Sequence, residues 1–423
     1  MAGSLENKSA STLLNWQALV PDALDQQKHW KKVLELGLPT RCDEDWKFTP
    51  FNFLYELPWH DRVPLVQRRI PKDLSYLGSE DVYRMVFING CWQKELSDSV
   101  CGVDISVLKG DDISTESLVV DPLDNEIVVE LTEALKTQMV KFTVAPKVIL
   151  DKPLCIIHYI DSFDGAVCAM RHHYQLGRLS QVKIIEHHVN LSEVSHKGVV
   201  FSNTSIEAQD GAQGEYIKIV EQGNEQLHLA HNHIVTNHDA NVTSSAYLLS
   251  GKWIRHKTSS ELGGENGVVE MNSLSLPARD QCFDSRTYLN HSVSHCRSHQ
   301  LHKVVAVDDG KGVFDGLIYV SPGALKTDGQ MDNHNLLIGD KAQINSQPKL
   351  EIYADDVKCS HGATTGQLDQ EQIFYLQARG IKKELAERMI IKAFAKEVCD
   401  LVSFEPICRY LLDHVEKKLE QSL

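Results

Sequence analysis

Short β-type segments, separated by polar turns, fill the middle of the chain and constrain its fold more than any other feature. Within residues 147–373, runs such as 182–186, 215–220 and 268–271 are rich in Val, Ile and other β-forming residues, and each follows a turn that contains Gly, Asn or Asp. No helical period of any length appears across this stretch. Many short strands at quasi-regular spacing are typical of an all-β solenoid, sandwich or barrel. The loose repeat, roughly 25 to 35 residues long with one longer gap, favours the solenoid by a small margin.

Helical patterns flank this β region on both sides. Near the N-terminus, Pro21 separates two predicted helices, and Gly37 ends the second. Beyond the β region, Asp369 begins a segment that resembles a capping box. A stripe of apolar residues at helical spacing then runs through residues 381–401, and Pro406 fits the first turn of a final helix. The chain is therefore expected to begin and end in helices.

A mixed segment connects the N-terminal helices to the β region. Residues 83–89 are a predicted short strand that ends at an Asn-Gly hairpin signal, and residues 131–141 are a predicted helix. These patterns divide the chain into four predicted regions: an N-terminal helical region, 1–75; a mixed α/β connecting region, 76–146; a β-helix core, 147–368; and a C-terminal helical region, 369–423.

Composition and charge argue against several classes of function. The chain of 423 residues has a net charge of −15, which disfavours a general nucleic-acid binder and attraction to anionic membranes. No apolar run of about 18 residues predicts a transmembrane helix, and the N-terminus shows no signal-peptide pattern. The ten cysteines form no paired zinc spacing and are typical of thiols kept reduced in the cytosol. We therefore expect a cytoplasmic protein without nucleic-acid or membrane partners.

A thiol and an imidazole lie two residues apart near the end of the β region. Residues 350–353 are a predicted strand closed by two aspartates, and Cys359 and His361 follow before a predicted turn of small residues at 362–366. In an extended segment, residues i and i+2 point to the same face, so Cys359 and His361 could face one ligand, such as a soft metal or a sulfur species. The structural alternative is that Cys359 is a small buried hydrophobe and His361 an ordinary hydrogen-bonded side chain.

Three long motifs resemble those of one protein family. The run YADDVKCSHGATTG at 353–366 is similar to a signature of the SufB/SufD family of the SUF iron–sulfur cluster assembly machinery, and within it of the SufD branch. The runs GLPTRCDEDWKFTP at 37–50 and LKTDGQMDNHNLLIG at 325–339 resemble further motifs of that family. The match extends from about Leu13 to the C-terminal helices, which is nearly the whole chain. Ordered motifs of this length are far more specific than one short pattern.

The resemblance implies a mainly β fold, with a right-handed parallel β-helix core between N-terminal and C-terminal helical regions. It implies a scaffold subunit rather than an enzyme. The isolated chain would hold no tightly bound cofactor and could form a homodimer. The partners would be a SufB-like scaffold, paired edge to edge through β-helix strands, and a SufC-like ATPase, docked on the C-terminal helices. The apolar stripe of these helices offers Met389, Ile390 and Phe394 as docking candidates, and the alternative is that the stripe only packs on the solenoid. Iron or a nascent iron–sulfur cluster would lie at the SufB–SufD interface, with His361 as the first candidate ligand and Cys359 as the second.

Two positions depart from the pattern that the resemblance implies for SufB. SufB would have a cysteine at the position of Asn333 and a glutamate at the position of Gly362. Both departures remove side chains that could bind a metal. They fit the SufD branch, in which this chain would supply part of a shared site instead of holding a cluster by itself.

Histidines outside this motif form further candidate groups. The densest run, HSVSHCRSHQLH, has spacings that would suit zinc on a helix, although the serines and the valine inside it are weak helix formers; its histidines are His291, His295, His299 and His302. His228, His231 and His233 form a second candidate group, in which His231 and His233 would share one face of a strand. The pairs at 172–173 and 187–188 would face apart. For these last three groups, polar side chains stacked along a solenoid face are the favoured interpretation.

The sequence lacks the motifs of several enzyme classes. It contains no GxxxxGK[ST] run for a P-loop and no GxSxG run for a hydrolase nucleophile. Two alternatives to the scaffold interpretation stay open: a stand-alone iron- or zinc-binding homodimer that uses the cluster at 291–302, and a polysaccharide-acting β-helix enzyme. The second class is typically exported, and the missing signal peptide and the reduced-type cysteines disfavour it.

Overall fold

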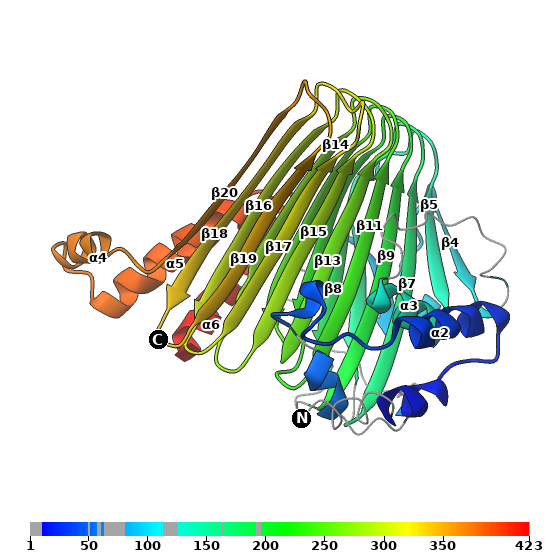
Figure 1. The fold of residues 1–423 in the computed structure, drawn as a ribbon, viewed down its shortest axis with the longest axis horizontal. Coiled ribbons are helices and arrows are strands. Elements are labelled where there is room, and N and C mark those ends of the chain that lie inside the picture. The colour runs from blue at the N-terminus through cyan, green and yellow to red at the C-terminus, as the bar shows by residue number, and fades with distance from the viewer. Residues whose placement is uncertain are drawn as a thin grey trace.

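Two stacked parallel β-sheets form the body of the molecule, a parallel β-solenoid whose successive strands alternate between the sheets (Figure 1). The computed structural model describes residues 11–49, 51–56, 61–62, 81–110, 112, 126–161, 164–191 and 196–422. From the pairs β5–β7 and β6–β8 onward, every described strand pair is parallel, which confirms the mainly β fold with a parallel β-helix core and helices at both ends.

Among the described residues, each sheet is a stack of ten strands. Sheet A contains, in order along the chain, β1 (Asp61–Arg62), β4 (Val103–Leu108), β5 (Met139–Val144), β7 (Ala166–Leu176), β9 (Gly198–Ala208), β11 (Leu227–Thr236), β13 (Trp253–Leu262), β15 (Cys282–His291), β17 (Lys311–Val320) and β19 (Gln343–Ile352). Sheet B contains β2 (Tyr83–Ile88), β3 (Cys91–Trp92), β6 (Leu154–Ile160), β8 (Gln181–Asn190), β10 (Gln213–Glu221), β12 (Asn241–Ser250), β14 (Val268–Ser275), β16 (Arg297–Val307), β18 (Asp328–Ile338) and β20 (Lys358–Gly366).

Side chains along each strand alternate between the interior of the solenoid, where the two sheets face each other, and its outer faces. Because the register is parallel, equivalent positions of successive strands stack in columns; Val182, Val242 and Val269 belong to one inward column of sheet B. Another inward column of the same sheet holds Glu186 and Lys218, both fully buried. The interior is therefore apolar at some levels and polar at others.

N-terminal segments cover the outer face of sheet A. The helices α2 (Leu24–Leu36) and α3 (Ile127–Leu135) pack together, and α3 lies against β7, β9 and β11 (Figure 1). The short 3₁₀ helices η1 (Glu44–Trp46) and η2 (Phe51–Glu56) add aromatic side chains to the same apolar cluster, and a third, η3 (Lys94–Leu96), follows β3. Trp46 and Phe51 surround Trp253 of β13, and the Arg255 guanidinium stacks 3.6 Å from the Trp46 ring centroid.

C-terminal helices cover the outer face of sheet B. They are α5 (Lys383–Cys399) and α6 (Glu405–Ser422), while α4 (Gln370–Gln377) packs on α5 and lies beyond the edge of the strands in Figure 1. Val398 and Leu411 pack on outward residues of sheet B, such as Tyr247, whose hydroxyl donates a hydrogen bond to the Val398 carbonyl at 3.0 Å. None of the described helices is long and apolar enough to cross a membrane.

Several local predictions are confirmed. Gly37, at a φ of 69°, follows the last residue of α2. Asn89 and Gly90 have positive φ angles and join β2 to β3 as an antiparallel hairpin. Asp369 caps α4, since its carboxylate accepts a hydrogen bond from the Glu371 N–H, and α6 begins one residue before Pro406.

Two local predictions are wrong. The predicted helix at 131–141 ends at Leu135, and β5 begins at Met139, because residues 139–144 pair with β4 and β7 and bury alternate apolar side chains in the core. The predicted turn at 362–366 is instead the second half of β20, where pairing with β18 keeps a run of small residues extended. Tertiary pairing overrides local propensity in both segments.

Candidate functional site at the open end of the solenoid

Both sheets end at the C-terminal side of the solenoid in strands with one neighbour. β20 hydrogen-bonds to β18 on one side, and no described strand pairs with its other side; β19 ends sheet A in the same way. Most residues of both strands are exposed or half-buried, in contrast to the buried strands before them. An unpaired edge presents backbone donors and acceptors to another chain.

Cys359 and His361 lie on β20 and share a face, as the spacing predicted. Cys359 is in register with Gly329, and His361 is in register with Met331, a fully buried residue of the interior. Both side chains therefore continue inward columns of sheet B. At this last strand no further described turn of the solenoid covers those columns, so the inward face opens toward solvent.

The Cys359 thiol is half-buried. Its Sγ lies 3.5 Å from the position that a Cβ on Gly329 would take, and the side chain packs against the apolar cluster around Ile318 and Met331. Burial raises the pKa of the Cys359 thiol, which disfavours the thiolate that binds metals. These contacts agree with a packing role in the isolated chain.

The His361 imidazole has different surroundings. The side chain is exposed, and it makes no hydrogen bond or ion pair with any other residue that the structure describes. Its ring nitrogens are therefore free to bind a ligand supplied from outside the chain. Of the two candidate ligands, His361 is the one available without rearrangement.

The two positions that depart from the SufB pattern lie beside this face. Asn333 is buried on β18, where its side-chain carbonyl accepts hydrogen bonds from Asn335 at 2.6 Å and Ser346 at 2.7 Å. A Cβ on Gly362 would lie 2.9 Å from Asp332 Oδ1, so a larger residue there would require Asp332 to move. Asn333 therefore serves the interior hydrogen-bond network of the solenoid.

The structure does not bring the histidines of the 291–302 run together. His291 ends β15 in sheet A, and its ring lies 2.9 Å from the Ser298 hydroxyl. His295 lies in a turn with a φ of 64°. On β16 in sheet B, His299 is exposed near Asp332, while His302 faces the interior and stacks on Phe314. These four side chains share no common point that a single ion could occupy.

The predicted ATPase-docking residues lie on two sides of α5. Met389 is 44% exposed, and Ile390 is half-buried. Phe394 is also half-buried, and it packs against the apolar cluster under α5 with the Lys303 ammonium 4.1 Å from its ring centroid. Met389 therefore belongs to the free surface of the helix, whereas Phe394 helps to hold the helix on sheet B.

Exposed aromatic residues extend this surface onto α4, which sequence reasoning missed. Phe374 is 71% exposed and Tyr375 is 57% exposed, while Ile373 anchors the helix. Tyr375, Leu376 and Ile390 line a shallow hollow between α4 and α5. The signal was present in the sequence as three consecutive apolar residues, which cannot all face one side of a helix.

Comparisons with known proteins are consistent with this arrangement. A family model described as "SUF system FeS cluster assembly, SufBD core domain" matches residues 158–394. The chain is similar to the iron–sulfur cluster assembly protein SufD of Escherichia coli, at 37% identity over 93% of this chain and 92% of the relative. It is 26% identical to a SufBD family protein of Synechocystis over 87% of this chain and 84% of the relative. It is also 27% identical to SufD of Bacillus subtilis, over 39% of this chain and 38% of the relative.

Proposed function

The chain belongs to the SufBD family of the SUF iron–sulfur cluster assembly system, and we propose that it is a non-catalytic scaffold subunit of an assembly complex. The observation that carries this proposal is the open end of the solenoid, where β20 pairs on one side only among the described strands and carries the exposed His361. A strand edge and a metal-ligating side chain in one place suit a site shared between two chains.

The partner at this edge is a SufB-like scaffold. Its own edge strands extend sheets A and B across the interface, so that backbone hydrogen bonds provide affinity and alternate side chains provide specificity. The exposed residues of β19 and β20 support this role, because they leave those strands without the buried environment of the earlier turns. The ten free thiols fit the proposed cytoplasmic location of the complex.

His361 is the ligand that this chain supplies to iron or a nascent cluster at the interface. Neutral imidazole is a suitable ligand for iron, and the His361 ring has no competing partner among the described residues. Cys359 joins the site only after pairing with the partner changes its half-buried surroundings. The isolated chain therefore holds no stable cluster.

A SufC-like ATPase docks on the surface formed by α4 and α5. The exposed aromatic residues Phe374 and Tyr375 and the exposed Met389 support this assignment, since large apolar side chains gathered on one surface are typical of protein interfaces. Neighbouring charges on α5, including Lys383 and Arg388, provide a polar rim. ATP hydrolysis belongs to that partner, because this sequence has no P-loop.

Co-expression with SufB-like and SufC-like proteins tests the proposal. We expect affinity purification of this chain to recover both partners in fixed stoichiometry, and the complex to mature a reporter iron–sulfur enzyme in cells without another assembly pathway. A chain that is purified alone from such cells, and that matures no reporter, would show that the scaffold assignment is wrong. Metal analysis of the tag-free chain distinguishes the stand-alone homodimer, and assays on polysaccharides distinguish the β-helix enzyme.

A further inference from the structure

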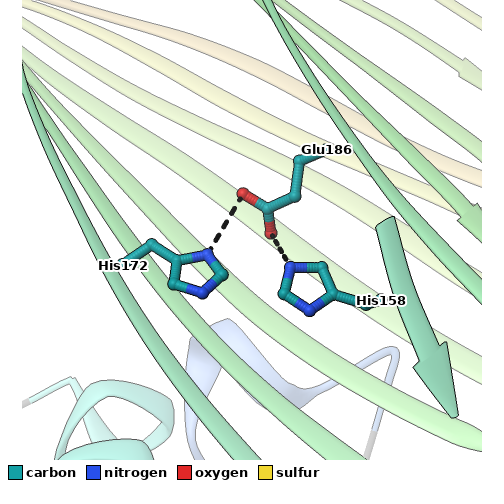
Figure 2. A group of neighbouring side chains, drawn as sticks. All are labelled: His158, His172 and Glu186. Atoms are coloured by element: carbon teal, nitrogen blue, oxygen red, sulfur yellow. Dashed lines mark ion pairs between the residues drawn. The ribbon is translucent and has the colours of Figure 1, made fainter. Parts of the chain in front are cut away.

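A group of potential metal ligands lies inside the solenoid, far along the stack from β20. His158 of β6, His172 of β7 and Glu186 of β8 meet in the interior, and Figure 2 shows both rings directed toward the carboxylate. All three side chains are buried, and one ligand atom of each lies within 4.8 Å of the others. His158 Nε2 is 3.8 Å from Glu186 Oε1, and His172 Nδ1 is 3.9 Å from Glu186 Oε2.

These two separations are too long for hydrogen bonds but close to those between ligands of one ion. Ligand atoms arranged tetrahedrally at 2.0–2.1 Å from zinc lie roughly 3.3 Å apart. The His158 and His172 nitrogens would therefore each move about half an ångström toward the carboxylate to bind a common ion. Two imidazoles and a carboxylate form a donor set that suits zinc or ferrous iron.

The unsatisfied nitrogens of His158 are an independent observation. The ring is fully buried, and neither nitrogen has a hydrogen-bond partner among the described residues. Buried polar atoms are normally satisfied, and those that are not call for an unseen water or ion.

Two groups next to the carboxylate would compete with an ion. The His188 ring donates a hydrogen bond to Glu186 Oε1 at 2.9 Å, and Lys218 lies beside the same oxygen. Its ammonium is 3.2 Å from Glu186 Oε1, and it also donates hydrogen bonds to Ser202 at 3.0 Å and Asn232 at 3.3 Å. When a cation binds the carboxylate, the Lys218 ammonium can keep its hydrogen bonds to these last two acceptors, Ser202 and Asn232. Tyr216 holds Glu186 Oε2 from the other side at 2.7 Å, which fixes the carboxylate in position.

We propose that the interior of the solenoid binds one divalent transition-metal ion through His158, His172 and Glu186. The ion links β6 and β8 of sheet B to β7 of sheet A and so ties the two sheets together at this level. Because the ligands are buried, the ion enters during folding and exchanges slowly afterwards. This site is distinct from the interface site at His361, and its existence does not depend on the proposed function.

Metal analysis of the tag-free full chain tests the proposal. The protein is refolded with Zn²⁺, or with Co²⁺ as a spectroscopic probe, and dialysed against a mild chelator. We expect close to one ion per chain and, with Co²⁺, visible absorption bands typical of nitrogen and oxygen ligands. Less than a tenth of an equivalent of either metal after refolding would overturn the proposal, and this result needs no variant.

Matched variants locate the ion. His158→Ala should lose it, whereas His228→Ala should retain it, because His228 is an equally buried histidine outside the ligand set whose nitrogens also lack described partners. Lys218→Met, which removes the competing ammonium, should bind metal at least as tightly as the unmodified chain. An ion that persists in a folded His158→Ala variant, as judged by circular dichroism, would place the metal elsewhere and overturn the assignment.

Discussion

Histidines occupy opposite surroundings at the two ends of the solenoid. In the turns formed by β6 to β8, His158 and His172 are enclosed by strands on both sides and by the facing sheet. On β20, His361 continues the same type of inward column, yet no described turn follows to cover it. The same type of side chain is thus a core component in the closed region and an exposed imidazole at the open end. Position in the stack, not residue type, decides which.

The largest loss of stability should appear when a buried charge is removed from the closed region, the turns formed by β6 to β8. Glu186→Gln would leave the buried Lys218 ammonium without its counter-charge. Breaking a buried pair typically costs about 3–5 kcal/mol, so we expect a loss of that size in the free energy of unfolding, measured by urea denaturation. Lys218→Met in the same chain should restore much of the loss. A Glu186→Gln variant of unchanged stability would mean that water reaches the interior.

The open end should show the reverse behaviour, with a strong functional effect and little effect on stability. His361→Ala should change the free energy of unfolding by no more than about 0.5 kcal/mol, because an exposed side chain contributes little packing. It should nevertheless reduce reporter maturation by the complex by at least about tenfold, as expected when a ligand that contributes about 1.4 kcal/mol or more is lost. Pulldown of the intact complex is the control.

Cys359→Ser in the same assay tests whether the site at the open end includes the half-buried Cys359 thiol as well as His361. A mild effect is expected if the thiol only packs on Gly329, and a loss equal to that of His361→Ala if both side chains serve the site. Normal maturation by His361→Ala would contradict the assignment of the ligand, and loss of partner binding would make His361 a structural residue of the interface.

The helix α5 allows the comparison of covered and free surfaces within one element. Met389→Asp should weaken ATPase binding at least tenfold in a pulldown or calorimetric titration while the melting temperature stays constant, because the residue is on the free side of the helix. Phe394→Asp should instead lower the melting temperature, since Phe394 packs under the helix beside Lys303. Equal stability of the two variants would show that α5 is not held on sheet B as described.

A smaller, pH-dependent effect is expected where α6 covers sheet B. Burial by itself would raise the pKa of the Glu221 carboxyl, but a hydrogen bond from His187, the nearby His414 ring and the Tyr410 hydroxyl outweigh it and lower the pKa to about 2. A carboxyl whose folded pKa lies below its unfolded value of about 4.3 stabilises the fold above that value and loses the contribution as the pH falls toward 2.

Glu221→Gln should therefore lower the free energy of unfolding by about 1–2 kcal/mol at pH 7. The difference from the unmodified chain should shrink between pH 5 and about pH 2, as followed by urea denaturation at several pH values. Lys396→Gln, which removes an exposed i, i+4 pair with Asp400 on α5, is a control that should change little. A constant difference across this pH range would mean that Glu221 does not hold α6 through its charge.

Much of the architecture could be predicted from sequence because it depends on local periodicity. Alternating β-type runs and turns indicated an all-β core and slightly favoured a solenoid, which the family resemblance then implied. Gly37, Asp369 and Pro406 marked helix boundaries that the structure confirms. The helix expected at 131–141 failed because pairing partners for β5 come from β4 and β7, far away in the chain. The pairing register between turns of the solenoid decides the structure of such segments. The residue pattern within a single strand carries no information about that register.

Part of the candidate site was also predictable from local spacing in the sequence. The i, i+2 spacing correctly gave Cys359 and His361 one face, but the difference in their exposure depends on where the stack ends. The buried cluster of His158, His172 and Glu186 was missed because His172 was read only as a member of an adjacent pair. A signal was present: Glu186 follows the inward-facing Ile184 at i+2, which places a carboxylate inside the solenoid.

The two ends of the stack differ in a way that limits how many such chains can join. Both ends finish in strands with one described neighbour, but β3 and β4 at the N-terminal end run antiparallel to that neighbour, whereas β19 and β20 at the C-terminal end run parallel to theirs. A chain that can pair at one end only forms a dimer and then stops, whereas a chain that can pair in the same way at both ends would polymerise into fibres. Because the two ends differ in strand direction, the proposed pairing through β19 and β20 would not continue at the N-terminal end, and an excess of this chain over its partner would not seed filaments.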